Sequence, residues 1–578
     1  MDNETIARTF MELADVLELT GEVQFKVRAF RTASRAIEGF PESITDKVTS
    51  GGKIKLAGVG DGMLRRIKEL ASTGKLEELD ERKKQLPGGL MDLMNLPGIG
   101  IKTAQQVWKE RGITSVDELE AAAKKGELRD LPRFGEKREE KLIAAITAWR
   151  KRASAPKRWP MASALETAEA LCARMRAMPG VLECQFAGSL RRRRETVGDL
   201  DILVAADASY AHAIMDAWST MPEVEEILAK GETKTTVVLK GGMQADLRVV
   251  PRESFGAALQ YFTGSKEHNV AMRTIAVKLK LKVSEYGVFD AKDKSIAGQD
   301  EAEVYEAIGL QWMPPEMREN RGEIDLAKNH ELPKLVELGD LKGDLHMHTV
   351  ESDGKSTLEE MIDEARKAGR KYVAITEHSQ SLAIAKGVTK ERLRAHIDRI
   401  RELREKFDGK IMILAGLESD ILADGALDMA DELKQLDWVI GSVHSKLDMD
   451  RESMTKRVVR AIESGMIDCL GHATGRMLGH REASALDIEQ VLLALKRTGT
   501  AIELNSSPLR LDIHENGARM ARDLGVLVAI NSDAHSTREL SFLKYGVGIA
   551  RRAWLGPEHV LTTKSAKALT DWRAARAS

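Results

Sequence analysis

The first 40 residues place hydrophobic side chains at the three- and four-residue spacing of amphipathic helices. Ile6, Phe10 and Leu13 fall on one helical face, and a second face of this kind follows between Phe25 and Ile37. The pattern predicts a small all-α region at the N-terminus.

Glycine turns separate the helical segments that follow. Gly58 and Gly60 form one turn, Gly98 and Gly100 a second, and a third is less marked. A single turn of this kind is typical of an ordinary helix connection. Three in succession are typical of helix-hairpin-helix elements, whose backbone and helix N-termini bind DNA phosphates. We therefore expect sequence-independent DNA binding, mainly by the second turn together with Lys102.

Period-two alternation predicts a strand that begins at Asp199 and carries Asp199 and Asp201 on one face, with apolar neighbours behind them. The runs 234–239 and 245–250 are also strand-like, and the second would place Asp246 on an adjacent strand of the same sheet. Three such carboxylates can hold two divalent cations about 3.5–4 Å apart. An isolated Asp-x-Asp would more often simply end a loop.

A turn at Gly188 and Ser189 precedes four consecutive arginines, residues 191–194. Such a turn can open a helix, and the N–H groups at a helix N-terminus attract phosphate. The arginines add positive charge beside the carboxylates. Together these features favour a site for metal ions and phosphate over a loop end.

From residue 343 onward, seven short apolar runs alternate with helical patterns, and almost every run ends in a histidine or an acidic residue. This alternation predicts a parallel βα barrel with its site at the C-terminal ends of the strands. His346 and His348, two positions apart on a strand, can point into one site, and imidazole with carboxylate suits Zn²⁺, Mn²⁺ or Fe. We interpret the histidines away from strand ends as structural: His396, His480, His514 and His559.

Composition changes this picture in two respects. The chain has 578 residues, which predicts three or four domains, and its three cysteines lack Cys-x-x-Cys spacing, which argues against a disulfide framework. The net charge of -2 is unevenly distributed along the chain. Residues 1–160 hold 30 Lys and Arg against 25 Asp and Glu, so the N-terminal part is basic. Neither a signal peptide nor an apolar span is evident, so we expect a soluble cytoplasmic protein with no membrane partner.

The segments around Gly188, Asp201, Asp246 and Tyr261 resemble the nucleotidyltransferase core of family X DNA polymerases. The resemblance extends from the first residues to about residue 320. It implies that Asp199, Asp201 and Asp246 bind two Mg²⁺ or Mn²⁺ ions, with Asp246 assisting removal of the primer 3′-hydroxyl proton.

The same resemblance implies which residues surround the incoming nucleotide. Ser189, Arg192 and Gly198 would contact the triphosphate, with Arg158 as a weaker candidate. The pocket for sugar and base, together with a probe of the minor groove, would be formed by Tyr261, Phe262, Asn269 and Arg273. Lys266 departs from the family pattern, where an acidic residue stands beside the nucleotide.

Some polymerases of this family also remove a 5′-deoxyribose phosphate, using a lysine amine as the nucleophile. Arg66 occupies the position of that lysine here, and Gly62 replaces another lysine of the site. Arginine stays protonated and cannot act as an amine nucleophile. Lys68 lies about 200° around the helix from Arg66. We therefore expect 5′-phosphate binding to persist more than lyase chemistry.

The C-terminal part resembles the PHP (polymerase and histidinol phosphatase) family. The nine positions of its metal-ligand pattern are His346, His348, Asp353, His378, Glu418, His444, His472, Asp533 and His535. The resemblance implies three divalent metals, held by His346, His348, Glu418 and Asp533, by Glu418, His444 and His472, and by Asp353, His378 and His535. Phosphoester hydrolysis would follow from water activation by these metals.

The predicted fold is multidomain: an all-α N-terminal region, an α+β nucleotidyltransferase palm with a small α/β thumb, and a distorted (β/α)7 PHP barrel. The expected boundaries are a lyase-like helical domain at 1–85, helix-hairpin-helix at 86–150, palm at 151–250, thumb at 251–318, linker at 319–340 and PHP domain at 341–578.

The resemblance implies a bacterial, nucleoid-associated monomer that binds gapped or primer–template DNA and dNTPs. It would combine gap-filling repair synthesis with 3′–5′ exonuclease, 3′-phosphatase or abasic endonuclease activity. In one alternative the PHP domain is only structural and supports a DNA-binding protein, although complete ligand sets argue against this. In another it hydrolyses small phosphoesters such as histidinol phosphate or pyrophosphate.

Overall fold

The computed structural model divides the chain into two compact units, residues 1–157 with 319–322, and residues 158–318 with 323–578. The residues that the structure describes are 3–38, 44–50, 54, 56, 59–94, 96, 99–132, 134–136, 139–140, 142–143, 146–147 and 158–577.

The first unit is built from short helices around two hydrophobic cores. In the first core α1 and α2 pack together, and the rings of Phe10 and Phe30 lie 5.8 Å apart. The second core begins at Leu90 and includes Val107 and Leu119. This confirms the predicted all-α region. The helices are α1 (Asn3–Leu19), α2 (Gln24–Glu38), α3 (Ile44–Thr49), α4 (Asp61–Thr73), α5 (Glu77–Lys83), α6 (Leu90–Leu93), α7 (Ile101–Arg111) and α8 (Val116–Lys125).

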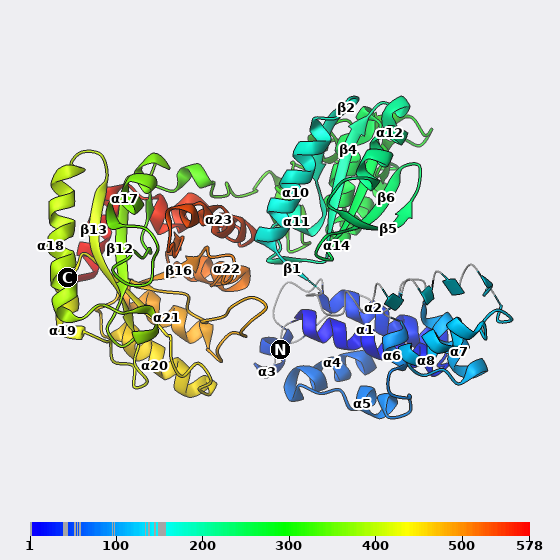
Figure 1. Ribbon diagram of the computed structural model, residues 1–578, viewed down its shortest axis with the longest axis horizontal. Helices are drawn as coiled ribbons and strands as arrows, with labels where there is room; N and C mark the ends of the chain where they lie inside the picture. The colour runs from blue at the N-terminus through cyan, green and yellow to red at the C-terminus, as the bar shows by residue number, and fades with distance from the viewer. Residues whose placement is uncertain are drawn as a thin grey trace. The chain divides into compact units, whose positions relative to one another are not determined.

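The second unit opens with a five-stranded sheet in the order β2-β4-β7-β6-β5. Helices α10 (Met161–Arg176) and α12 (Ala208–Ser219) cover one face, against Ile202 and Val204 (Figure 1). The opposite face of β4 packs Leu203 against α13 (Phe255–Thr263). The strands are β2 (Val181–Phe186), β4 (Asp199–Ala206), β5 (Val224–Lys230), β6 (Lys234–Leu239) and β7 (Gln244–Val250), and β1 (Trp159–Pro160) pairs separately with β3 (Thr196–Val197).

A smaller α/β region follows the sheet and has its own core around Met272, Val288 and Tyr305. It contains α14 (Lys266–Lys278), α15 (Glu301–Glu306) and a three-stranded sheet of β8 (Lys282–Ser284), β9 (Gly287–Phe289) and β10 (Ser295–Ala297). Helix α16 (Glu323–Asn329) lies within the stretch that we expected to be a linker.

Seven parallel strands, β11 to β17, then pair in chain order. A bridge between Met347 and Ala534 joins the first and last strands and nearly closes the barrel, as predicted. The strands are β11 (Gly343–Asp344), β12 (Tyr372–His378), β13 (Met412–Asp420), β14 (Trp438–Ser442), β15 (Cys469–Leu470), β16 (Ala501–Asn505) and β17 (Val528–Asn531).

Helices surround these strands (Figure 1), because each βα crossover buries the apolar face of its helix against the sheet. They are α17 (Leu358–Lys367), α18 (Lys390–Lys406), α19 (Ala430–Leu433), α20 (Arg451–Glu463), α21 (Ile488–Thr498), α22 (Glu515–Leu524), α23 (Leu543–Arg552) and α24 (Ala566–Ala577). Across the described residues, no helix combines the length and hydropathy needed to cross a membrane.

Candidate active sites

Three carboxylates meet on two adjacent parallel strands of the palm sheet. Asp201 on β4 pairs in register with Asp246 on β7, and Asp199 lies two residues earlier on the same face of β4. Burial, together with the charges of Asp199 and Asp246, raises the pKa of Asp201 to about 7. Lys234 Nζ lies 2.5 Å from Asp246 Oδ2, whereas the buried Asp246 Oδ1 has no hydrogen-bond partner among the described residues. This crowded set of oxygens suits a divalent cation, which would relieve the repulsion.

The turn before the arginines lies directly against this carboxylate cluster. Gly188 starts the short helix α11 (Gly188–Arg191) with a φ of 63°, and a Cβ at this position would lie 2.2 Å from Asp201 Oδ2. Only glycine permits this close approach. Ser189 is the second residue of this helix. Arg192 directly follows the helix, and its guanidinium donates to the Thr263 carbonyl at the end of α13.

The candidate pocket for sugar and base lies at the end of α13 and the start of α14. The Asn269 amide donates to the Tyr261 carbonyl at 2.7 Å, and Arg273 Nε donates to the Asn269 carbonyl at 3.3 Å. The Arg248 guanidinium lies 4.2 Å from the centre of the Phe262 ring, which connects this pocket to the strand of Asp246.

Gly198, Arg158 and Lys266 are the other residues that the sequence resemblance places near the nucleotide. Gly198 immediately precedes β4, and Lys266 is the first residue of α14. Arg158 donates to the Thr196 side chain at 2.8 Å and to the Thr196 carbonyl at 2.6 Å.

In the first unit, two of the predicted DNA-contacting glycines begin helices. Gly60 precedes α4 and Gly100 precedes α7, both with extended backbone, and a Cβ at either position would meet no atom within 4 Å. Lys102 is exposed in the first turn of α7. The predicted contacts at Gly58 and Gly98 lie outside the described residues.

Arg66, at the position expected for the lyase lysine, lies on α4. It forms an ion pair of 2.6 Å with Glu78 and donates to the Gly62 carbonyl at 3.0 Å. Lys68 is exposed on another side of the same helix. The Arg66 guanidinium is thus committed to structural partners.

The nine predicted metal ligands of the C-terminal part converge at the C-terminal ends of the barrel strands. Glu418, on β13, is fully buried at the centre of the group. Its Oε1 lies 2.9 Å from His472 Nε2 and 3.3 Å from His444 Nε2, and its Oε2 lies 2.8 Å from His378 Nδ1 and 3.5 Å from His346 Nε2. His348 Nε2 lies 3.6 Å from the same Oε2, so five imidazoles surround one carboxylate.

Two further carboxylates complete the group. Asp353 Oδ1 lies 3.4 Å from His378 Nε2 and 3.3 Å from His535 Nε2, and Asp533 Oδ1 lies 3.2 Å from His348 Nε2. Possible metal-binding groups overlap in three sets: His348, Asp353, His378 and His535; His346, His348 and Glu418; and His378, Glu418 and His444. His348 and His378 each belong to two of these possible sets, and the division among three metals that the resemblance implies stays a prediction.

The electrostatics of this cluster suit divalent cations. Both oxygens of Glu418 are buried. Although imidazole nitrogens lie as close as 2.8 Å, none within the described part of the chain has hydrogen-bond geometry to either oxygen. Burial opposes its charge, yet the imidazoles of His444, His378 and His346 hold the pKa of Glu418 well below its ordinary value. Against the effect of burial, Glu418 and Asp353 raise the pKa of His378 to about 10. A cation would satisfy the negative potential that otherwise favours this proton, so the cluster can hold divalent metals.

Two carboxylates that the sequence did not single out contact these histidines without belonging to the nine predicted ligands. Glu503, in the middle of β16, lies 2.7 Å from His346 Nδ1 and accepts from the His472 backbone N–H at 2.8 Å. Asp420 Oδ1 lies 3.2 Å from His444 Nδ1. Such contacts orient imidazoles toward a metal. The only signal in the sequence was that both carboxylates stand near the ends of strands.

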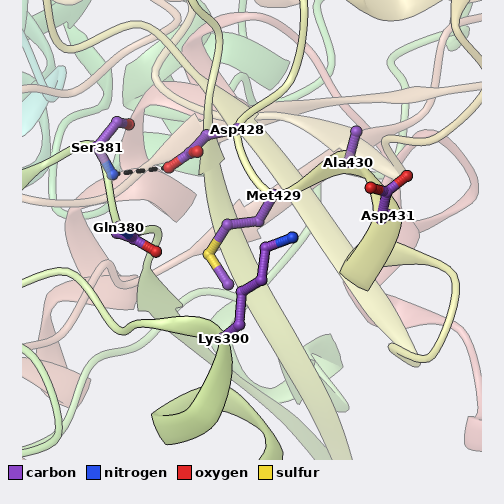
Figure 2. Close-up of a pocket in the computed structure, with 7 residues that line it drawn as sticks. All are labelled: Gln380, Ser381, Lys390, Asp428, Met429, Ala430 and Asp431. Carbon is purple, nitrogen blue, oxygen red and sulfur yellow. Dashed lines mark hydrogen bonds between the residues drawn. The ribbon is translucent and has the colours of Figure 1, made fainter.

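A cavity of about 450 Å³ opens beside the cluster, between the segments that follow β12 and β13 (Figure 2). Figure 2 shows Lys390 beside Met429, and the Ser381 N–H donating to Asp428 at 2.7 Å. The Ser381 hydroxyl also lies 3.4 Å from Asp420, which contacts His444. The cavity therefore adjoins the metal cluster without containing any of its nine residues.

Four known sequence families match segments of the chain. They are described as "Helix-hairpin-helix domain" over residues 1–76, "SAM-like Helix-hairpin-helix tandem" over 90–147, "DNA polymerase beta thumb" over 258–319 and "PHP domain" over 344–507.

One relative matches almost the whole chain. The "DNA polymerase/3'-5' exonuclease PolX" of Bacillus subtilis is 37% identical over 571 residues, which is 98% of each protein. The chain belongs to the family X DNA polymerases that carry a C-terminal PHP domain. As a member of this family it is an enzyme.

Other relatives match only a part of the chain. A "Probable phosphatase" of Thermoanaerobacter is 31% identical over 239 residues, which is 39% of this chain and 91% of the relative. Another, from Shewanella sediminis, is 30% identical over 244 residues, 40% of this chain and 94% of the relative. Each of these relatives therefore corresponds, over nearly its whole length, to about two fifths of this family X polymerase.

Proposed function

We propose that this polymerase fills short gaps in DNA and that its PHP barrel processes 3′-ends, chiefly as a 3′–5′ exonuclease. The observation that carries the proposal is the presence of two complete and separate ligand clusters in one chain, the carboxylates on β4 and β7 and the nine residues at the barrel strand ends. The two share no residue, so each can support its own reaction. The two reactions are chemically opposed, which suits repair because damaged 3′-ends must be cleaned before extension.

In the palm, Asp199, Asp201 and Asp246 would hold two divalent cations, Mg²⁺ or Mn²⁺, which when bound stabilise charge on the transferred phosphoryl group. Asp246 has one oxygen committed to Lys234 and one without a hydrogen bond in the described structure, so Oδ1 is suited to receive the primer 3′-hydroxyl proton.

Ser189, Arg192 and Gly198 would bind the triphosphate. Arg192 donates to the Thr263 carbonyl, so its guanidinium is held between the turn after α11 and the end of α13. A bidentate guanidinium matches the geometry of phosphate oxygens. Arg158, whose guanidinium donates to Thr196, stays a weaker candidate.

Tyr261, Phe262 and Asn269 would form the pocket for sugar and base, with Arg273 probing the minor groove of the new pair. Hydrogen bonds hold the Asn269 side chain on the Tyr261 carbonyl and the Arg273 side chain on the Asn269 carbonyl. Gly60, Gly100 and Lys102 would bind the DNA backbone, since open space above both glycines lets a phosphate approach helix N-terminal N–H groups.

In the barrel, the nine residues would hold three divalent metals, which when bound activate water and stabilise phosphoryl oxygens. Glu418 would be a ligand shared between metals, because its Oε1 faces His472 and His444 whereas its Oε2 faces His378, His346 and His348. Glu503 and Asp420 would keep His346 and His444 in the orientation that metal binding requires.

A second candidate for the barrel is hydrolysis of small phosphoesters. It is favoured by the relatives described as probable phosphatases, which match 39% and 40% of this chain over 91% and 94% of their own lengths. We favour DNA 3′-ends, since the barrel is covalently joined to a polymerase.

A labelled primer on gapped DNA tests both parts of the proposal. With dNTPs and Mg²⁺ or Mn²⁺, a primer with a normal 3′-end should be extended across the gap. A primer blocked by a 3′-phosphate should be extended only after the end is removed. Extension without any 3′-end removal, combined with hydrolysis of p-nitrophenyl phosphate or histidinol phosphate, would favour the second candidate.

A further inference from the structure

Three positions of the palm turn that contains Arg192, namely 192, 193 and 195, contact residues of the PHP barrel. Arg552, the last residue of α23, donates from Nη1 to the Arg192 carbonyl at 2.6 Å. Arg476 forms a bidentate ion pair with Glu195, at 2.5 and 3.1 Å. Between these two contacts, the side chain of Arg193 lies against α23, since a Cβ at Gly548 would be 3.3 Å from three of its carbon atoms.

The two barrel arginines are themselves firmly held. Arg552 is 1% exposed, and its Nε donates to the Glu515 carboxylate at the start of α22. Arg476 donates from Nε to the Arg510 carbonyl at 2.9 Å and from Nη2 to the Leu511 carbonyl. Buried arginines with several fixed acceptors have little rotational freedom. They therefore present rigid donors to the palm turn.

The turn they hold is irregular and cannot be fixed by regular secondary structure alone. The helix α11 ends at Arg191, and Arg193 has a φ of 58°, in the left-handed region that is unfavourable for arginine. Burial lowers the pKa of Arg193. Contacts from outside the turn must compensate for this backbone conformation and for the buried charge.

We propose that Arg552 and Arg476 are positioning residues for the polymerase reaction. They fix the backbone on both sides of Arg192 and so hold its guanidinium where the triphosphate of the incoming nucleotide binds. This inference rests on the proposed role of Arg192. It makes dNTP affinity of the palm depend on the PHP barrel through contacts that are separate from the barrel's metal ligands.

The test measures single-nucleotide insertion by the full-length protein at varied dNTP concentration. Arg552→Ala and Arg476→Ala should each raise KM for dNTP roughly three- to tenfold, with kcat changed by less than about twofold. Arg552→Lys keeps a cationic donor for the Arg192 carbonyl and should restore much of the affinity. Glu195→Gln alters the palm side alone and should resemble Arg476→Ala.

Arg551→Ala is the matched control. Its side chain forms an ion pair of 2.7 Å with Glu316, so it joins the barrel to the polymerase part through a residue outside the Arg192 turn, although its charge and that of Glu316 act on Arg193. It should leave KM for dNTP unchanged. An equal rise in KM for Arg551→Ala would overturn the proposal, because the effect would then reflect general loosening between the two parts.

Arg192→Ala separates this inference from the proposed function. If Arg192→Ala raises KM while Arg552→Ala, Arg476→Ala and Glu195→Gln do not, the positioning role is wrong and the proposed function stands. If Arg192→Ala itself leaves KM unchanged, the proposed triphosphate contact fails, and the inference fails with it.

Discussion

The two candidate active sites of this chain differ in the chemistry of their ligands. The palm site consists of three carboxylates beside a run of arginines, whereas the barrel site combines six histidines with three carboxylates. Oxygen-only sites suit hard cations such as Mg²⁺, and imidazole-rich sites suit Zn²⁺, Mn²⁺ or Fe. If both sites act as proposed, this difference would keep two opposed reactions apart, since each site would select its own metals and could be disabled alone.

The support behind the ligands differs in the same way. A cationic side chain lies beside the palm carboxylates, since Lys234 is 2.5 Å from Asp246. Behind the barrel histidines stand further carboxylates, with Glu503 at 2.7 Å from His346 and Asp420 at 3.2 Å from His444. Cations oppose repulsion among carboxylates, and carboxylates orient imidazoles. Mutations in these supporting residues should therefore act on only one site.

The largest expected effect comes from His346→Ala combined with His348→Ala. Both side chains lie within 3.6 Å of Glu418 and of Asp533, so their loss should disrupt metal binding at the centre of the cluster. Shortening of a 5′-labelled primer should fall by at least about a hundredfold. Polymerisation should remain within about twofold of wild type.

His212→Ala is the control for this pair, since His212 is exposed on α12 and contacts neither cluster. Primer shortening at the wild-type rate by the double variant would place the nuclease elsewhere in the chain.

Glu503→Gln should have the next largest effect. It preserves the shape of the side chain but removes the charge that orients His346, and such changes typically cost about 10- to 100-fold in metal affinity. Metal content after dialysis against a graded chelator measures this directly, and dNTP incorporation should not change. Glu489→Gln, an exposed substitution on α21, is the control. Equal metal retention by both variants would exclude the orienting role of Glu503.

Arg192→Ala should weaken dNTP binding about tenfold or more, because a charge-assisted hydrogen bond contributes roughly 1.5–3 kcal/mol. Single-turnover insertion at varied dNTP concentration gives the apparent affinity. Exonuclease activity should not change, since Arg192 belongs to the palm. Arg174→Ala removes an exposed arginine from α10 and serves as the control. An unaltered dNTP affinity for Arg192→Ala would contradict the assignment.

The smallest expected effect concerns stability and neither active site. His396 on α18 is buried, neither ring nitrogen has a hydrogen-bond partner among the residues described, and burial lowers its pKa to about 4. The unfolded chain, with a pKa near 6.5, binds a proton that the folded chain excludes between these values. Stability should therefore fall as pH drops through 6.5, by about 2 kcal/mol at pH 5, and stop falling below about 4.

His396→Leu should remove this component of the pH dependence. Calorimetric melting at pH 7 and pH 5 compares the two proteins, and the variant should lose less stability on acidification. Identical losses would show that His396 titrates normally in the folded barrel.

Much of both sites could be predicted from the sequence because their ligands follow local patterns. Period-two alternation was enough to place Asp199 and Asp201 on one face of β4, and the barrel ligands stand where short apolar runs end. The assignment of ligands to separate metals depends on the directions of side chains from different strands. For this reason the overlap at His348 and His378 appears only in three dimensions.

The supporting contacts could not be predicted, since they join residues far apart in the chain. Glu503 reaches His346 across 157 positions, and Arg552 reaches Arg192 across 360. No periodicity or motif records such pairs. Gly188 is an intermediate case. Its place in a turn was evident, but the reason that no other residue fits is the Asp201 carboxylate 2.2 Å from where a Cβ would stand.

The central claim is that polymerisation and 3′-end hydrolysis take place at independent metal sites. Asp199→Ala combined with Asp201→Ala tests it most directly, with both activities measured on the same 5′-labelled primer in gapped DNA. The account predicts that dNTP incorporation disappears while primer shortening continues within about twofold of wild type, because the two clusters share no ligand. Comparable loss of both activities in a variant that melts like wild type would contradict it.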